Sequence, residues 1–126
     1  MVIVDGNNVM GQRVGWHRNK SAAQQRLIEE VERTARHRNE PYILVFDAGP
    51  ESCIPDGVRQ SPFTVRYARR GKSADELILE LVYSQGKPSD VTVVTSDRAL
   101  TRQIQALGAK AMRSGDFRHL LEAPSR

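Results

Sequence analysis

Residues 2–11 read VIVDGNNVMG, an apolar run that ends in an aspartate, a glycine and two asparagines. A short apolar run bounded by turn-forming residues is typical of a strand buried on both faces of a parallel sheet. We therefore predict a buried strand over residues 2–5, with Asp5 at its carboxyl end and Gly6 allowing the chain to turn sharply. The carboxylate needs an explanation, because a buried charge is costly unless it is paired or bound to a metal.

The rest of the chain alternates between apolar runs and segments of helical periodicity. Strands are predicted over YILVFD (42–47), FTVRYA (63–68), VTVVTSD (91–97) and AKAM (109–112). Helices are predicted where apolar residues recur at spacings of three and four, around residues 23–35, 77–82, 100–107 and 117–121. Residues 48–61 hold two prolines and two glycines without periodicity and are predicted as a long loop. This order predicts one α/β domain over residues 1–126, with three layers and a mostly parallel central sheet of four to five strands.

Several helix boundaries and surface pairs are also predicted. Ser73 and Glu76 form a capping-box pattern, which indicates a helix start directly after Ser73. Residues 39–41, Asn-Glu-Pro, end the first long helix, and Gly108 stands where a glycine commonly terminates a helix. Three pairs of opposite charge at i,i+4 spacing are predicted to form exposed ion pairs on the first long helix: Arg26–Glu30, Glu29–Arg33 and Glu32–Arg36.

The composition is that of a soluble globular protein, with 39% hydrophobic and 27% charged residues. No apolar stretch approaches the roughly 18 residues of a membrane span, and no basic leader with a long apolar core opens the sequence. A cytoplasmic location is therefore expected. The single cysteine, Cys53, has no partner for an internal disulfide. Nineteen Lys and Arg against fifteen Asp and Glu give a net charge of +4, which favours a polyanionic partner.

Four aspartates are predicted to converge on one edge of the sheet. Asp5, Asp47 and Asp97 each end a predicted strand, and parallel strands place their carboxyl ends along one edge. Asp75 lies in the first turn of a helix that enters from the same edge. Helix capping is the competing interpretation for Asp75 and Asp97, because acids near a helix N-terminus are stabilised by the helix dipole.

Four carboxylates so close together would repel one another unless their pKa values rise or a cation neutralises them. Oxygen ligands suit Mg²⁺ or Mn²⁺, and such an ion would support phosphodiester hydrolysis by activating water and neutralising phosphoryl oxygens. One of Asn7 and Asn8 is a candidate to hold a metal-bound water or a phosphate oxygen. Turn formation is the alternative for Asn7 and Asn8, as helix capping is for Ser96.

Two basic clusters, residues 12–20 and 66–72, flank these acids. Such residues contact phosphates, and Trp16 or Tyr67 can stack on an unpaired base. The alternatives are solvated loops for the basic residues and partial burial against the neighbouring helix for Trp16. The candidate RNA-binding residues are Arg13, Trp16, Arg18, Lys20, Arg66, Arg69, Arg70 and Lys72.

Four motifs, VDGNNVM, VFDAGP, KSADELI and VVTSDRAL, occur in this order and resemble the NYN domain of the PIN-like nuclease superfamily, in particular its YacP-like branch. The resemblance extends to about Phe117. It implies a PIN-like (Rossmann-like) fold and a Mg²⁺- or Mn²⁺-dependent ribonuclease. It also makes the ribosome a candidate partner, because some members of the branch act on ribosome-associated RNA.

The resemblance implies roles by position. The first acid of the family matches Asp5, the motif asparagine matches Asn8, and the acids of the AD and TSD motifs match Asp75 and Asp97; these three acids are the implied metal ligands. Asp47 matches the acid of the second strand and ranks below them in an implied catalytic set of five.

Two features depart from the family pattern: the position between Gly6 and Asn8, often aromatic in this branch, is Asn7, and the chain is shorter than many relatives.

The predicted activity is hydrolysis of RNA phosphodiester bonds, endonucleolytic, with single-stranded mRNA or rRNA as substrate. The principal alternative is an inactive module of the same fold that only binds RNA or docks on the ribosome. A phosphatase of the haloacid dehalogenase type would need a second acid two residues after its strand-end aspartate, which neither VDGNN nor VFDAG provides. No G-x-G-x-x-G follows a predicted strand, which excludes a dinucleotide-binding domain.

Overall fold

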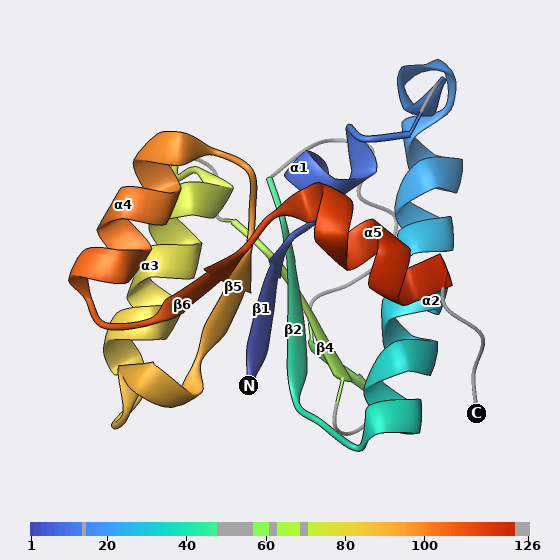
Figure 1. The fold of residues 1–126 in the computed structure, drawn as a ribbon. Helices are drawn as coiled ribbons and strands as arrows, with labels where there is room; N and C mark the ends of the chain where they lie inside the picture. The colour runs from blue at the N-terminus through green and yellow to red at the C-terminus, as the bar shows by residue number, and fades with distance from the viewer. Residues whose placement is uncertain (14, 48–56, 61–62, 69–70, 123–126) are drawn as a thin grey trace.

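The computed structural model is a three-layer α/β fold built around a six-stranded sheet (Figure 1). It describes residues 1–13, 15–47, 57–60, 63–68 and 71–122, with only the backbone described for 57–60. The strands are β1 (Val2–Asp5), β2 (Tyr42–Phe46), β3 (Gly57–Gln60), β4 (Phe63–Tyr67), β5 (Thr92–Val94) and β6 (Lys110–Met112), in the spatial order β3-β4-β2-β1-β5-β6.

Five of these strands are parallel, which confirms the predicted mostly parallel sheet. The exception is β3, which pairs antiparallel with β4 at the edge of the sheet, with an irregularity between Val58 and Gln60. The prediction of a loop over residues 48–61 is therefore wrong for 57–60. This segment is a strand because its backbone pairs with β4. Backbone pairing does not depend on alternating apolar side chains, so the sequence pattern did not reveal it.

The helices form the two outer layers. They are α1 (Gly6–Met10), α2 (Lys20–Arg38), α3 (Ala74–Ser84), α4 (Arg98–Ala106) and α5 (Ser114–Glu122), with 3₁₀ turns η1 (Trp16–Arg18) and η2 (Pro88–Asp90). Helices α1, α2 and α5 cover one face of the sheet, and α3 and α4 cover the other (Figure 1). The four longer helices confirm the predicted ones, whereas α1 has five residues, too few to show a helical period. Among the described helices, none combines the length and apolar character that crossing a membrane requires.

The central strands are apolar throughout because both of their faces are covered. In β1, Val2 and Val4 belong to the core beneath α2 and α5, whereas Ile3 belongs to the core beneath α3 and α4. In β2, Phe46 lies in the first core and Val45 in the second. This alternation follows from the pleat of a strand. It places every second residue of each strand on the α3–α4 side.

The predicted helix boundaries are present. The Ser73 hydroxyl accepts a hydrogen bond from the Glu76 backbone N–H (3.2 Å) at the start of α3. Asn39 ends α2 in the left-handed conformation (φ 49°), and Gly108 follows α4 with φ 93°. A left-handed residue ends a helix because it turns the backbone away from the axis while the last carbonyls stay bonded.

The predicted ion pairs on α2 are only partly present. Glu32 and Arg36 pair at 3.7 Å. Glu30 does not pair with Arg26, because Arg13 Nη2 donates to both of its carboxylate oxygens (2.7 and 2.6 Å). Among the described residues, Glu29 accepts from Gln25 (3.2 Å) and forms no ion pair with Arg33. The Arg13–Glu30 pair lies between segments distant in sequence, so helical spacing could not predict it.

Gly6 is required by close packing. A Cβ atom at this position would lie 2.6 Å from Phe46 Cε1 and 2.8 Å from the Val45 carbonyl oxygen. The chain changes from strand to helix at Gly6, the first residue of α1, but without a positive φ, so close packing and not backbone conformation requires glycine here. Its missing side chain lets α1 begin directly against β2.

We expect Gly6→Ala to lower the free energy of unfolding by about 1–3 kcal/mol, because the Val45 carbonyl cannot move without disturbing the sheet. Urea denaturation followed by circular dichroism measures this. Gly115→Ala in α5 is the control, since a Cβ there meets no atom within 4 Å and should leave stability unchanged or slightly raised. Equal midpoints for the two variants would contradict the packing argument.

Candidate active site

Four aspartates lie at the carboxyl edge of the sheet. Asp5 ends β1, Asp47 directly follows β2, and Asp97 is the N-cap of α4. Asp75 lies in the first turn of α3. The charges of Asp75 and Asp47 raise the pKa of Asp5, and those of Asp97 and Asp47 raise the pKa of Asp75. Asp75 is therefore within electrostatic reach of the other three carboxylates, and Asp47 is within reach of Asp5 as well.

Asp5 is the buried member of this cluster, with 5% of its surface exposed. Burial raises the pKa of its carboxyl from 3.8 to about 6; hydrogen bonds oppose this rise and the charges of Asp75 and Asp47 add to it. The main described partner is the Thr95 hydroxyl, which donates to Asp5 Oδ2 at 2.9 Å. A carboxylate held at this position resists ionisation more than an exposed one.

Thr95 is a site residue that sequence reasoning missed. It is 1% exposed, donates to Asp5 and accepts from the Asp97 backbone N–H (3.2 Å). Strand register contained the signal: β1 and β5 pair Val4 with Val94, so the next residues on the two strands, Asp5 and Thr95, lie side by side. Thr95 thereby connects the carboxylate that ends β1 to the backbone that begins α4.

Two of the acids also cap helices. Asp97 Oδ1 accepts from the Leu100 backbone N–H (3.0 Å), so the capping interpretation holds for Asp97. It does not hold for Ser96, whose hydroxyl accepts instead from the Ser114 backbone N–H (3.0 Å). Asp47 Oδ1 accepts from the Ala74 backbone N–H (2.9 Å), across to the start of α3. Each of these caps uses one carboxylate oxygen.

Asn7 and Asn8 connect α1 to the two strands that flank β1. Asn7 Oδ1 accepts from the Asp47 backbone N–H (2.8 Å), just beyond β2. Asn8 Oδ1 accepts from the Ser96 backbone N–H (2.9 Å), beyond β5, and from the buried Ser114 hydroxyl (2.5 Å). The Asn8 oxygen is thus occupied by two donors, which leaves its amide nitrogen as the group able to face a phosphate or a water.

The cluster has the donor chemistry of a hard-cation site but forms no chelate among the described residues. Within residues 1–13, 15–47, 57–60, 63–68 and 71–122, no group of three or more His, Cys, Asp or Glu side chains is arranged to hold a metal ion. The cluster nevertheless offers only carboxylate oxygens, the ligands that Mg²⁺ and Mn²⁺ prefer. Its like charges also raise the pKa values of Asp5 and Asp75, which a cation would relieve.

The candidate RNA-binding residues occupy varied environments. Arg13 is held by Glu30, with 18% of its side chain exposed. Trp16 is half-buried and packs on the core beneath α2 and α5, as its alternative interpretation expected, with Lys20 Nζ 5.8 Å from its ring centroid. Arg18 is exposed at the end of η1.

The second basic cluster is only partly visible. Arg66 is half-buried in β4, and Lys72 is exposed and ion-paired with Glu80. Arg69 and Arg70, like Cys53, lie outside the described residues.

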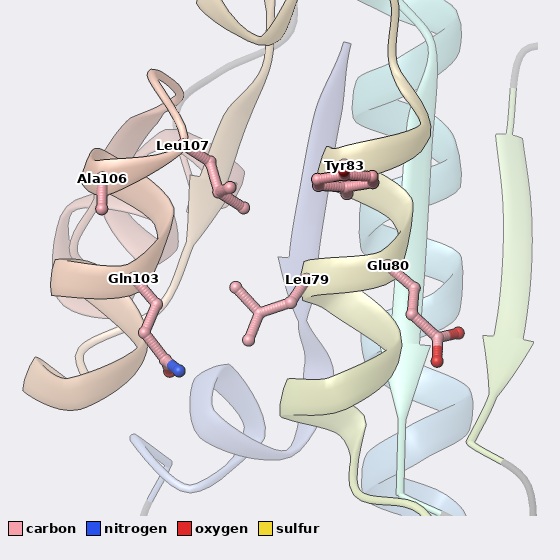
Figure 2. Close-up of a pocket in the computed structure, with 6 residues that line it drawn as sticks. All are labelled: Leu79, Glu80, Tyr83, Gln103, Ala106 and Leu107. Carbon is pink, nitrogen blue, oxygen red and sulfur yellow. The ribbon is translucent and has the colours of Figure 1, made fainter.

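A surface groove of ≈ 550 Å³ lies between α3 and α4 (Figure 2). Leu79 and Leu107 extend toward each other across it, beside the exposed ring of Tyr83. Its single carboxylate, Glu80, pairs with Lys72. The groove is mainly apolar and contains none of the four aspartates, so it is not the candidate active site.

We expect the free energy of unfolding to fall as pH rises, when measured without divalent cations. The folded-state pKa of Asp5 exceeds its ordinary value of 3.8, so its stabilising contribution is full below about pH 4 and is lost as pH rises through about 6. The raised pKa of Asp75 acts in the same direction.

Asp5→Asn keeps an acceptor for Thr95 without a charge. The wild-type free energy of unfolding should fall by roughly 3 kcal/mol between pH 4 and pH 7 because of Asp5, and the Asp5→Asn variant should not show this decrease. Denaturation at each pH measures this, and Asp90→Asn, an exposed aspartate, should keep the wild-type profile. Matching profiles for Asp5→Asn and wild type would contradict the assignment.

Comparison with known proteins agrees with this architecture. The family model of the YacP-like NYN domain matches residues 2–126. The structure of Rae1 (YacP) from Bacillus subtilis superposes with a TM-score of 0.80 at 23% identity, covering 97% of this chain and 73% of that one. The W164L mutant of the same protein gives a TM-score of 0.77 at 22% identity, covering 96% and 74%. A search of curated proteins found no match. The chain belongs to the YacP-like NYN domain family and has its nuclease-type fold.

Proposed function

We propose that this chain is a divalent-metal-dependent ribonuclease that cleaves RNA phosphodiester bonds endonucleolytically at the acidic carboxyl edge of the sheet. The observation that carries the proposal is Asp5, a carboxylate buried at the end of the central strand whose pKa is raised by burial and by neighbouring acids. Such an arrangement destabilises the fold, so a structural role alone does not explain it. Membership of the YacP-like NYN family adds support.

In this proposal Asp5, Asp75 and Asp97 would hold Mg²⁺ or Mn²⁺, and the chemistry gained there would be activation of water and neutralisation of charge on the phosphoryl oxygens. The chain itself orients the ligands: Thr95 fixes one Asp5 oxygen, and the α4 cap fixes one Asp97 oxygen. Asn8 is held through its oxygen, which leaves its amide nitrogen as the group proposed to contact the substrate.

The proposed substrate is single-stranded mRNA or rRNA. The net charge of +4 favours a polyanion, and Arg18 and Lys20 lie on the segment that follows α1 at the acidic edge of the sheet. Arg66, Arg69, Arg70 and Lys72 are proposed as a second set of phosphate contacts. We assign Arg13 the structural role of attaching this segment to α2, given its ion pair with Glu30. A cytoplasmic setting, with the ribosome as candidate partner, belongs to the same proposal.

A non-catalytic RNA-binding module is the second candidate. The observation that favours it is that Asp47 and Asp97 both cap helices, so two of the four acids have structural work that requires no metal. Neither cap accounts for Asp5, which is why we rank catalysis first.

We expect the purified protein to cleave single-stranded RNA with Mn²⁺ or Mg²⁺ and to lose this activity in EDTA. Asp75→Asn and Asp97→Asn should each reduce the rate at least about 100-fold, since each removes a charged ligand. Asparagine also caps helices well, so Asp97→Asn should keep its fold. Asp116→Asn, an exposed aspartate in α5, is the matched control and should retain full activity.

A circular RNA substrate separates endonucleolytic from exonucleolytic cleavage, because only an endonuclease opens it. Activity that persists in EDTA and in both Asp75→Asn and Asp97→Asn would exclude the proposed site.

We also expect Arg69→Ala, Arg70→Ala and Lys72→Ala together to weaken RNA binding and to flatten its salt dependence. Losing three phosphate contacts should reduce the slope of log K against log salt by about 2. The control replaces three exposed arginines, Arg33, Arg36 and Arg38, with alanine. They lie near the C-terminal end of α2, toward the opposite edge of the sheet (Figure 1). A wild-type slope in the variant that lacks Arg69, Arg70 and Lys72 would show that these residues do not contact RNA.

A further inference from the structure

We infer that Asp47 is a positioning residue for helix α3 and Asp75, itself held by Asn7, and not a metal ligand. The inference rests on the proposed function, because it divides the acids of that site into ligands and a support. It separates Asp47 from Asp5, Asp75 and Asp97.

The contacts form a continuous connection through three elements. Asn7, in α1, accepts from the backbone N–H of Asp47 at 2.8 Å. Asp47, beyond β2, accepts from the backbone N–H of Ala74 at 2.9 Å. Ala74 is the first residue of α3, and Asp75 is the next. The position of Asp75 is thus tied through Asp47 to the same helix that follows Asp5.

The Ala74 bond explains an acid at position 47 without a cation. Ala74 is 3% exposed, and its N–H belongs to the first turn of α3, where no intrahelical acceptor exists. Ser73 caps the N–H of Glu76 and leaves that of Ala74 to Asp47. A carboxylate also interacts favourably with the positive end of a helix dipole.

Exposure separates Asp47 from the proposed ligands. Asp5 is buried and Asp75 and Asp97 are half-buried, whereas Asp47 is exposed. Its charge also has the weakest influence among the causes that shift the pKa of Asp5, and a weaker influence than Asp97 on the pKa of Asp75. Asp47 therefore lies at the margin of the cluster.

Asn7 gives the connection its first link. Its amide oxygen, in α1, accepts from the Asp47 backbone N–H directly after β2, so α1 secures the end of that strand.

The test compares Asp47→Asn with Asp47→Ala. Asparagine retains an oxygen that can accept from Ala74 but carries no charge, so it should keep kcat on single-stranded RNA within about threefold of wild type. Alanine removes the acceptor and should lower kcat about 10- to 100-fold through misplacement of Asp75, with little change in KM. Equal losses in both variants would identify Asp47 as a ligand, and no loss in either would show that it positions nothing. Should Asp47→Ala fail to fold, the activity of Asp47→Asn decides alone.

Two further readouts do not depend on catalysis. In metal-free protein, amide hydrogen exchange at Ala74 should be roughly fivefold faster or more in Asp47→Ala and unchanged in Asp47→Asn. Calorimetric titration with Mn²⁺ should give wild-type affinity for Asp47→Asn but not for Asp75→Asn. Unchanged exchange in Asp47→Ala, or Mn²⁺ affinity lost in Asp47→Asn, would overturn the inference. If the wild type cleaves no RNA, the proposed function fails, while the exchange measurement still decides the role of Asp47.

Asn7 is tested by a double-mutant cycle on the exchange rate of Ala74. If Asn7 acts through Asp47, adding Asn7→Ala to Asp47→Ala should change the rate no further, whereas Asn7→Ala alone should raise it. Additive effects would show that the two residues act separately.

Discussion

The burial of the Asp5 carboxylate at the end of the central strand is the constraint on which the site depends. Strand β1 lies between β2 and β5, and helices cover both faces, so its last residue is surrounded by protein. Alternation along the strand puts Asp5 on the α3–α4 side with Ile3. Thr95 reaches it from β5, and Asp75 approaches it from α3. The acids therefore meet because the last residue of β1 faces the α3–α4 side and α3 begins at the same edge of the sheet.

The two asparagines that follow Asp5 hold the backbone just beyond the ends of the neighbouring strands β2 and β5. Asn7 accepts from the residue after β2, and Asn8 accepts from the second residue after β5, so α1 bridges both neighbours of β1. The absent side chain of Gly6 allows this, because any Cβ would collide with the Val45 carbonyl. The close packing of α1 and the hydrogen bonds accepted by its two asparagine side chains together hold the sheet edge at which the acids lie.

The candidate site combines stabilising and destabilising acids. Asp47 and Asp97 accept hydrogen bonds from backbone N–H groups at the starts of α3 and α4 that have no acceptor within the helix, and so stabilise those helices. Asp5 has the opposite effect at neutral pH, because its pKa is raised by burial. Acids whose pKa values are perturbed and that weaken the fold are characteristic of functional sites. The apolar groove between α3 and α4 lacks this feature.

The sequence by itself determined the parallel strands, the longer helices and the acidic edge. Apolar runs at residues 2–5, 42–47, 63–68 and 91–97 predict buried strands, and aspartates at three of their ends predict an acidic edge, because these signals are local. Tertiary structure decided the partners. Arg13 binds Glu30, Asp47 caps α3, Asn8 binds Ser114, and residues 57–60 become an edge strand through contacts between distant segments. No periodicity records such contacts, because each depends on where the folded backbone brings two separate groups, and for this reason the role of each acid could not be read from its position in the chain.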